Sequence, residues 1–124
     1  MTDQERAKDQ AKAQLNSIIE MVNDLNNAED TEEAEQRIQE DPLSVQVRSD
    51  WEDPSDNLKA TEFNILLCTG GPAVRIIGDL DSYQYPETAR LQYQDWFTQW
   101  EDYPLDQDEE NALITYAQQF YFGE

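Results

Sequence analysis

The sequence predicts an α+β fold in which helices pack on one face of an antiparallel sheet of about four strands. Two observations predict this fold. Apolar residues recur at helical spacing near both ends of the chain, and the middle of the chain contains alternating runs separated by turn residues. The order of two helices, the strands and one helix favours helices segregated to one face. The 124 residues are expected to form one domain, 1–124, with a helical part at 1–41, the sheet at 44–96 and a C-terminal helix at 106–122.

Two N-terminal helices are expected before residue 42. Over 3–25 the apolar residues recur three and four positions apart, the stripe of an amphipathic helix: Ala11, Leu15, Ile18, Ile19, Val22 and Leu25. Asp30 followed by Glu33 has the pattern of a capping box, which predicts a second helix that runs through Glu40. Pro42 ends this helix, because the residue before a proline disfavours the helical conformation.

The middle of the chain predicts an antiparallel meander. Residues 44–48 alternate polar and apolar side chains, as in a half-buried strand. The runs 63–68 and 73–78 flank the turn sequence Thr-Gly-Gly-Pro at 69–72, which indicates a β-hairpin. Alternation over 89–96 adds the fourth strand.

A C-terminal helix packed on the sheet is predicted from a second capping-box pattern, Asp106 with Glu109. Its apolar face comprises Leu113, Ala117, Phe120 and Tyr121. The segment 99–104 before it is aromatic and acidic.

Negative charge is the strongest compositional signal. The chain has 28 Asp and Glu against 8 Lys and Arg, a formal net charge of -20. This excess argues against direct binding of nucleic acid or anionic lipid, both of which require basic patches. A partner that recognises the charge should therefore be a basic protein surface.

Composition also narrows the chemistry. The chain has no histidine, the commonest general base, and a single cysteine, Cys68, which forms no internal disulfide. There is no apolar signal core and no membrane-length run, so we expect a cytoplasmic protein of a host bacterial cell with no membrane contact. We therefore expect that the protein is not an enzyme and that it has no catalytic residue, no metal site and no cofactor.

The acidic residues form three clusters along the chain. The first acidic cluster is Glu29, Asp30, Glu32, Glu33, Glu35, Glu40 and Asp41. The second is Asp50, Glu52, Asp53 and Asp56, and the third is Glu101, Asp102, Asp106, Asp108, Glu109 and Glu110. We expect these carboxylates to bind the partner in place of phosphates, although some complement a helix dipole and a merely solvated acidic surface is the alternative. The hypothesis depends on whether the clusters share one face.

Aromatic residues near the third cluster suggest an anchor. Trp100 and Tyr103 lie beside Glu101 and Asp102, and aromatic side chains rimmed by charge suit a basic groove. Most of the other aromatic side chains are expected in the core.

Other motifs are weaker. The 69–72 sequence lacks the lysine and the following helix of a phosphate-binding loop, and Asp79-Leu80-Asp81 lacks the spacing of an EF-hand. Carboxylate pairs for glycoside hydrolysis can be chosen almost anywhere among 28 acids, so they have no specificity. Cys68, in an apolar strand, is expected to be a core residue.

The strings ILLCTGGPAVRI at 65–76, GDLD at 78–81, LQYQDW at 91–96 and QQFYF at 118–122 resemble a family of short acidic proteins of bacteriophages and other mobile elements. The resemblance covers about two thirds of the chain, from Asp41 to the end, and carries no functional residue. It implies a setting in which small acidic proteins often inhibit host defence, as anti-CRISPR and anti-restriction proteins do.

The sequence thus predicts an anti-CRISPR-type inhibitor, a nucleic-acid mimic bound to the basic nucleic-acid site of a Cas effector or restriction enzyme. The alternative is a phage structural or adaptor protein without mimicry, possibly homodimeric through its apolar helix. A monomer or a homodimer is compatible with the sequence.

Overall fold

The computed structural model describes residues 3–49, 51, 54, 59–69, 72–95 and 99–120. The helices are α1 (Asp3–Asn27), α2 (Glu32–Gln39) and α3 (Gln107–Ala117). The strands are β1 (Ser44–Arg48), β2 (Glu62–Cys68), β3 (Ala73–Asp79), β4 (Arg90–Gln94) and β5 (Glu101–Tyr103). The predicted α+β class is therefore confirmed.

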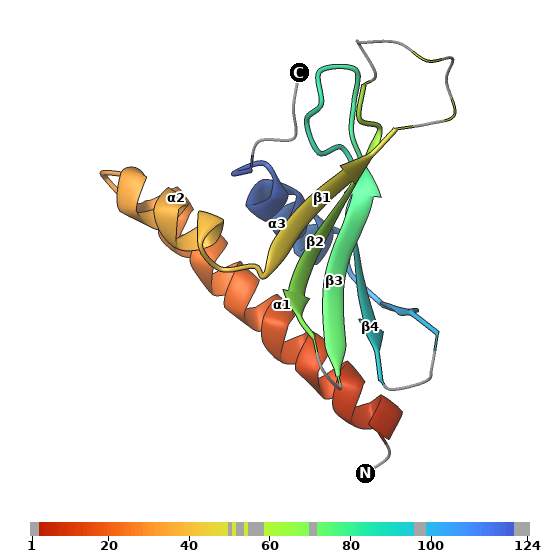
Figure 1. Ribbon diagram of the computed structural model, residues 1–124. Helices are drawn as coiled ribbons and strands as arrows, with labels where there is room; N and C mark the ends of the chain where they lie inside the picture. The colour runs from red at the N-terminus through yellow and green to blue at the C-terminus, as the bar shows by residue number, and fades with distance from the viewer. Residues whose placement is uncertain are drawn as a thin grey trace.

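The strands form one antiparallel sheet in the order β1-β2-β3-β4-β5, a meander with one strand more than predicted (Figure 1). The additional strand, β5, has three residues and pairs with β4, Leu91 opposite Tyr103. So short an edge strand contains too little alternation to be recognised from its sequence.

The helices α1 and α3 lie behind the same face of the sheet (Figure 1). The stripe predicted for α1 is confirmed, with Ala11, Leu15 and Ile18 at most 1% exposed. Alternate residues of β2 and β4, among them Ile65 and Leu91, meet them in one hydrophobic core. The other side of the sheet has no helix over it in the described part of the chain (Figure 1), and its side chains range from exposed, at Arg48 and Arg90, to buried, at Gln92.

The start of α2 differs from the prediction. The helix begins at Glu32 after Thr31, whose side chain makes no capping hydrogen bond, so the Asp30–Glu33 capping box is wrong. Asp30 instead accepts the Glu32 N–H at 3.0 Å, a turn that an aspartate makes locally as readily as a cap. The helix ends at Gln39, one residue early.

Strand β1 occupies the predicted residues but is exposed along its whole length, not half-buried. Val45 and Val47 are 37% and 48% exposed, although they lie opposite the buried Ile65 and Phe63. Helix α1 packs on β3 and β4, whereas β1 lies at the edge of the sheet and is not covered by α1. Alternation alone does not show whether an element covers a strand.

The predicted capping box of α3 is confirmed. Asp106 accepts the Glu109 N–H at 2.8 Å, and Glu109 accepts the Asp106 N–H at 2.9 Å. Leu113, Tyr116 and Ala117 are buried and Phe120 packs against the core, whereas Tyr121 lies outside the described residues.

Gly78 is required by close packing in β3. A Cβ at this position would lie 2.0 Å from the Thr88 carbonyl oxygen and 2.8 Å from the Phe63 ring, which crosses it from β2. Any side chain here forces backbone to move.

None of the helices described is long and apolar enough to cross a membrane.

Candidate functional site

A hollow between the end of α1 and α2, which we call the acidic groove, has a volume of about 730 Å³. Its described carboxylates come from both helices and from the turns before and after α2: Asp24, Asp30, Glu33, Glu40 and Asp41. Arg37 is the one cation among the residues that line it. The groove therefore has a strongly negative wall and is open to solvent.

Contacts from three elements fix α2 beside this groove. Ile38 is fully buried in the core, and the Arg37 guanidinium lies 2.9 Å from Asp24 of α1. In the same last turn of α2, Gln39 Nε2 donates to the Gln119 carbonyl at 3.0 Å. A helix of eight residues is not stable alone, so these contacts determine where its carboxylates lie.

The buried Tyr116 hydroxyl donates to Asp41 Oδ2 at 2.8 Å and joins α3 to the turn after α2. Burial, with the hydrogen bond to the Asp41 carboxylate, raises the pKa of Tyr116 far above its usual range. The hydroxyl therefore remains a donor over the physiological range, and the Asp41 carboxylate has a structural role.

Four members of the first acidic cluster have no such role. Within the described chain the Glu29, Glu32, Glu33 and Glu35 side chains have no hydrogen bond or ion pair, and all but the half-buried Glu35 are exposed. Three of them are in the first turn of α2, where the helix dipole favours negative charge. These carboxylates remain available to a partner.

The second acidic cluster cannot be placed. Asp50, Glu52, Asp53 and Asp56 lie outside the described residues. The neighbouring Trp51 is described and is completely exposed.

The third acidic cluster lies on β5 and at the start of α3, and much of it is used within the fold. Asp106 and Glu109 form the capping box. Asp102 accepts from Gln92 at 2.8 Å and lies 4.0 Å from Arg90. Burial raises the pKa of Tyr93, and a hydrogen bond with the exposed Glu101 raises it further. Asp108 is exposed in the first turn of α3, and Glu110 is half-buried there.

The proposed aromatic anchor is divided between the two sides of the sheet. The Trp100 ring lies under the Arg75 guanidinium, with 4.0 Å between Cζ and the ring centroid. Tyr103 packs against the hydrophobic core on the helix side. The two rings therefore do not form one exposed patch.

The first and third clusters do not converge. Helix α2 leads into β1, and β5 is at the opposite edge of the sheet. Four strand spacings, roughly 19 Å, separate these edges, and Figure 1 shows α2 projecting beyond the β1 edge. Of the described clusters, the first is the one that leaves most carboxylates free.

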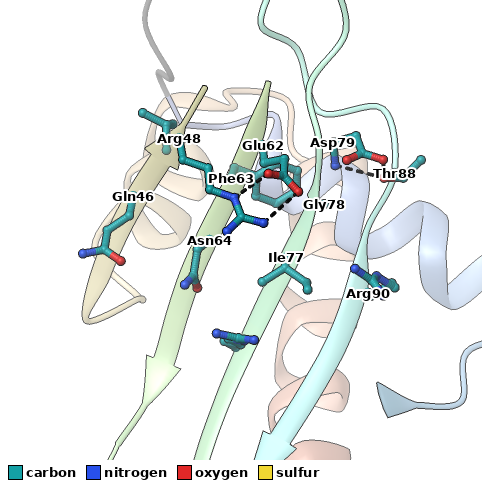
Figure 2. Close-up of a pocket in the computed structure, with 12 residues that line it drawn as sticks. Gln46, Arg48, Glu62, Phe63, Asn64, Ile77, Gly78, Asp79, Thr88 and Arg90 are labelled. Atoms are coloured by element: carbon teal, nitrogen blue, oxygen red, sulfur yellow. Dashed lines mark hydrogen bonds and ion pairs between the residues drawn. The ribbon is translucent and has the colours of Figure 1, made fainter. Parts of the chain in front are cut away.

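A second feature, which the sequence reasoning missed, is the arginine face: Arg48, Arg75 and Arg90 on the side of the sheet opposite helices α1 and α3. The strand register places them in three adjacent rows across the sheet. The upper row contains Arg48, Glu62 and Asp79, the middle row Gln46, Asn64, Ile77 and Arg90, and the lower row Leu66, Arg75, Gln92 and Asp102. Figure 2 shows Arg48 reaching across β2 to Glu62, with Arg90 on the far strand.

A cavity of about 320 Å³ lies on this face, lined by residues of β1 to β4. Arg48 makes two contacts with the Glu62 carboxylate, which lower the pKa of Glu62. Burial, and then the charges of Arg48 and Arg90, lower the pKa of Arg75. In the middle row the Asn64 Oδ1 atom is buried without a hydrogen bond among the described residues, a cost of about 1–3 kcal/mol.

Strand alternation is the signal that finds the arginine face. Arg48 and Arg90 each occupy a position on the polar side of a predicted strand, and Arg75 is the one charged residue in the apolar run 73–78. They are three of only eight cations in the chain, so their common side is informative. The pairing register, which brings them into adjacent rows, is not encoded in any single strand.

The other motifs have structural roles. Asp81 Oδ1 accepts the Tyr83 and Tyr85 N–H groups at 2.8 and 3.1 Å and shapes their loop, so it is occupied. Burial raises the pKa of the half-buried Cys68 thiol, which disfavours the thiolate. Among the described residues, no three His, Cys, Asp or Glu side chains are grouped as a metal site would require.

Comparison with protein-family models, curated proteins and solved structures finds no match to this chain.

Proposed function

We propose that this protein binds a basic, nucleic-acid-binding surface of a host protein through the acidic groove and the free carboxylates of α2. By occupying that surface it excludes nucleic acid, as an anti-defence inhibitor of the anti-CRISPR or anti-restriction type would. The observation that carries the proposal is the groove itself, with five carboxylates and one cation along its lining.

The first acidic cluster concentrates negative charge in a short stretch. Residues 29–41 contain seven carboxylates and Arg37, an excess of six negative charges. The eight residues of α2 span roughly 12 Å at helical rise, and Glu29, Asp30, Glu40 and Asp41 lie in the turns before and after the helix. This local density of carboxylates supports imitation of a phosphate backbone.

Lysine and arginine side chains of the partner would donate charge-assisted hydrogen bonds to these carboxylates. The exposed Glu32 and Glu33 lie on a helix that the core fixes in place, so little order is lost when they bind. Such an interface should form quickly and weaken with salt.

The test uses a variant with three neutralised carboxylates, Glu32→Gln, Glu33→Gln and Glu40→Gln, called the groove variant. Its matched control, the control variant, is Asp9→Asn, Glu20→Gln and Glu87→Gln, which removes three exposed charges from α1 and the loop before β4. Immobilised wild-type protein should retain from a bacterial lysate a basic protein that duplex or single-stranded DNA elutes. The groove variant should lose this protein and the control variant should keep it.

Equal retention by the wild type and the groove variant would contradict the proposal. Loss by both variants would show that only net charge matters, which would also contradict a localised site. Elution by salt but not by DNA would exclude competition with nucleic acid.

The edge strand β1 favours a second candidate, a structural or adaptor protein that forms a homodimer. Leu43, Val45 and Val47 are 60%, 37% and 48% exposed, and β1 pairs with β2 on one side only within the described sheet. Strand addition at such an edge is a common mode of association. Light scattering after size exclusion tests it: a dimer of about twice 14.4 kDa that Val45→Lys dissociates would support the adaptor, and a monomer at high concentration would exclude it.

A further inference from the structure

We propose that the arginine face binds a small molecule carrying a phosphate group, in the cavity bounded by Arg48, Arg75 and Arg90. The site is separate from the acidic groove and has the opposite charge preference, so this inference goes beyond the proposed function.

The cavity has cations on two of its sides. Arg48 comes from β1 and Arg90 from β4, and both line it. Between them the middle row places Asn64 and Ile77 on the central strands, so the floor is partly polar and partly apolar (Figure 2). A ligand that rests on this floor lies between two guanidinium groups.

Arg75 supplies the third cation, and it contacts no carboxylate in the part of the chain that the structure describes. Its Nε donates to Gln92 Oε1 at 2.9 Å, and its guanidinium stacks 4.0 Å from the Trp100 ring centroid. The amide and the ring fix the plane of the guanidinium and leave its terminal N–H groups for another acceptor. A planar guanidinium with two free parallel donors matches the oxygens of a phosphate.

The arginine face is far less negative than the chain as a whole. Among the described residues, Arg48, Arg75 and Arg90 line the cavity with Glu62 and Asp79, and Asp102 lies 4.0 Å from Arg90, so the charges of this face balance in a chain of net -20. Glu62 already binds Arg48, and Asp79 accepts from the Thr88 hydroxyl at 3.3 Å. At 0.1 M salt, charges more than about 10 Å away are largely screened, so these local groups and not the net charge determine what the cavity binds.

Size and total charge restrict the ligand to a small molecule. The volume of about 320 Å³ is at the lower end of the range for small-molecule sites. A nucleic acid would extend beyond the arginine face toward the acidic surfaces, which repel it. A sugar phosphate, with a dianionic group for the guanidiniums and a compact body for the floor, fits both limits.

The experiment measures binding of ribose 5-phosphate by calorimetry and by amide NMR shifts, at constant ionic strength. Inorganic phosphate, uncharged ribose and malonate are the comparison probes. Ribose 5-phosphate should bind most tightly and inorganic phosphate more weakly, with ribose undetectable, and the shifts should map to β2, β3 and β4.

Arg75→Gln and the more exposed Arg90→Gln should each weaken binding about tenfold or more, because each removes a charged donor. Arg37→Gln, which removes the same charge from the acidic groove, should change it less than about twofold. Circular dichroism of each variant shows whether it is folded, and Arg90→Gln remains informative if Arg75→Gln is not.

Three results would overturn the inference: no binding of either phosphate probe, equal weakening by Arg37→Gln, or tighter binding of malonate than of ribose 5-phosphate. The groove variant should bind ribose 5-phosphate as the wild type does. Failure of the acidic-groove proposal and failure of this one are therefore distinguishable.

Discussion

The acidic groove and the arginine face differ in how they are built. The groove lies beside a helix of eight residues whose carboxylates are mostly free, whereas the arginine face lies on four paired strands and its cations contact neighbouring side chains. Free charges on a locally anchored helix suit a protein partner that brings its own cations. Positioned cations over a shallow cavity suit a small anion. The net charge of the chain therefore does not describe either surface.

The largest effect is expected at Gly78, on the core side of β3 behind the arginine face. Gly78→Ala places a methyl group against the Thr88 carbonyl and the Phe63 ring, which should lower the free energy of unfolding by about 1–3 kcal/mol. Urea denaturation measures the loss. Ser44→Ala, an exposed substitution at the start of β1, should change stability by less than about 0.5 kcal/mol. Equal stability of Gly78→Ala and wild type would mean that the strands are not packed this closely.

A smaller effect is expected at the base of the acidic groove. Tyr116→Phe removes the hydrogen bond to Asp41, with an expected loss of about 1–2 kcal/mol because the acceptor is charged. Amide hydrogen exchange should rise in α2 more than in β3. Uniform exchange in both elements would show that Tyr116 does not hold the turn after α2.

The same tyrosine gives a pH dependence. The pKa of Tyr116 is raised in the folded protein, so its contribution is complete below the unfolded tyrosine pKa of about 10. Above that pH the unfolded state loses the proton first, and the free energy of unfolding should fall as pH rises. Urea midpoints between pH 8 and 11 should fall less steeply in Tyr116→Phe. Parallel pH dependences in wild type and Tyr116→Phe would contradict the claim that the Tyr116 hydroxyl is buried with a raised pKa.

Substitutions in the two described acidic clusters should differ in their effect on the stability of the protein. Asp106→Ala removes the cap of α3 and should cost about 1 kcal/mol. Glu29→Ala, in the first cluster, should remain within about 0.5 kcal/mol of wild type because its carboxylate has no partner in the described chain. Thermal unfolding compares the two. A reversed order would mean that the first cluster is the structural one.

The smallest effect is expected at the exposed Arg48–Glu62 pair. Glu62→Gln should cost less than about 1 kcal/mol, since the Arg48 side chain is 76% exposed. The pKa of Glu62 is lowered, chiefly by its hydrogen bond to Arg48, so this contribution is present above the unfolded value of about 4.3 and is lost as pH falls. The difference between wild type and variant should therefore shrink as pH falls below about 4.3. A difference that does not shrink as pH falls would require another cause.

The sequence predicted most of the fold because its signals were local. The α1 stripe, the four longer strands and the Asp106 capping box each depend on residues close in the chain. The errors arose where tertiary packing decides. β1 is exposed because none of the described helices covers that edge, and β5 is too short to show a pattern.

The candidate sites were predictable only in part. The first acidic cluster is contiguous in the sequence, and so its free carboxylates were found. The groove was not predicted, because Asp24 on α1 meets Arg37 on α2 only through helix packing. The arginine face requires the register of four strands, which joins residues as distant as Arg48 and Arg90. Trp100 was predicted to anchor a partner, and its stacking on Arg75 within the fold was not predicted.

The most direct test of the acidic-groove proposal is the salt dependence of binding to the captured partner. The wild-type association constant should fall about tenfold or more between 50 and 200 mM NaCl. The groove variant, Glu32→Gln, Glu33→Gln and Glu40→Gln, should bind more weakly with a shallower dependence, and the control variant should follow the wild type. A salt dependence that the groove variant leaves unchanged would contradict the claim that these carboxylates form the binding surface.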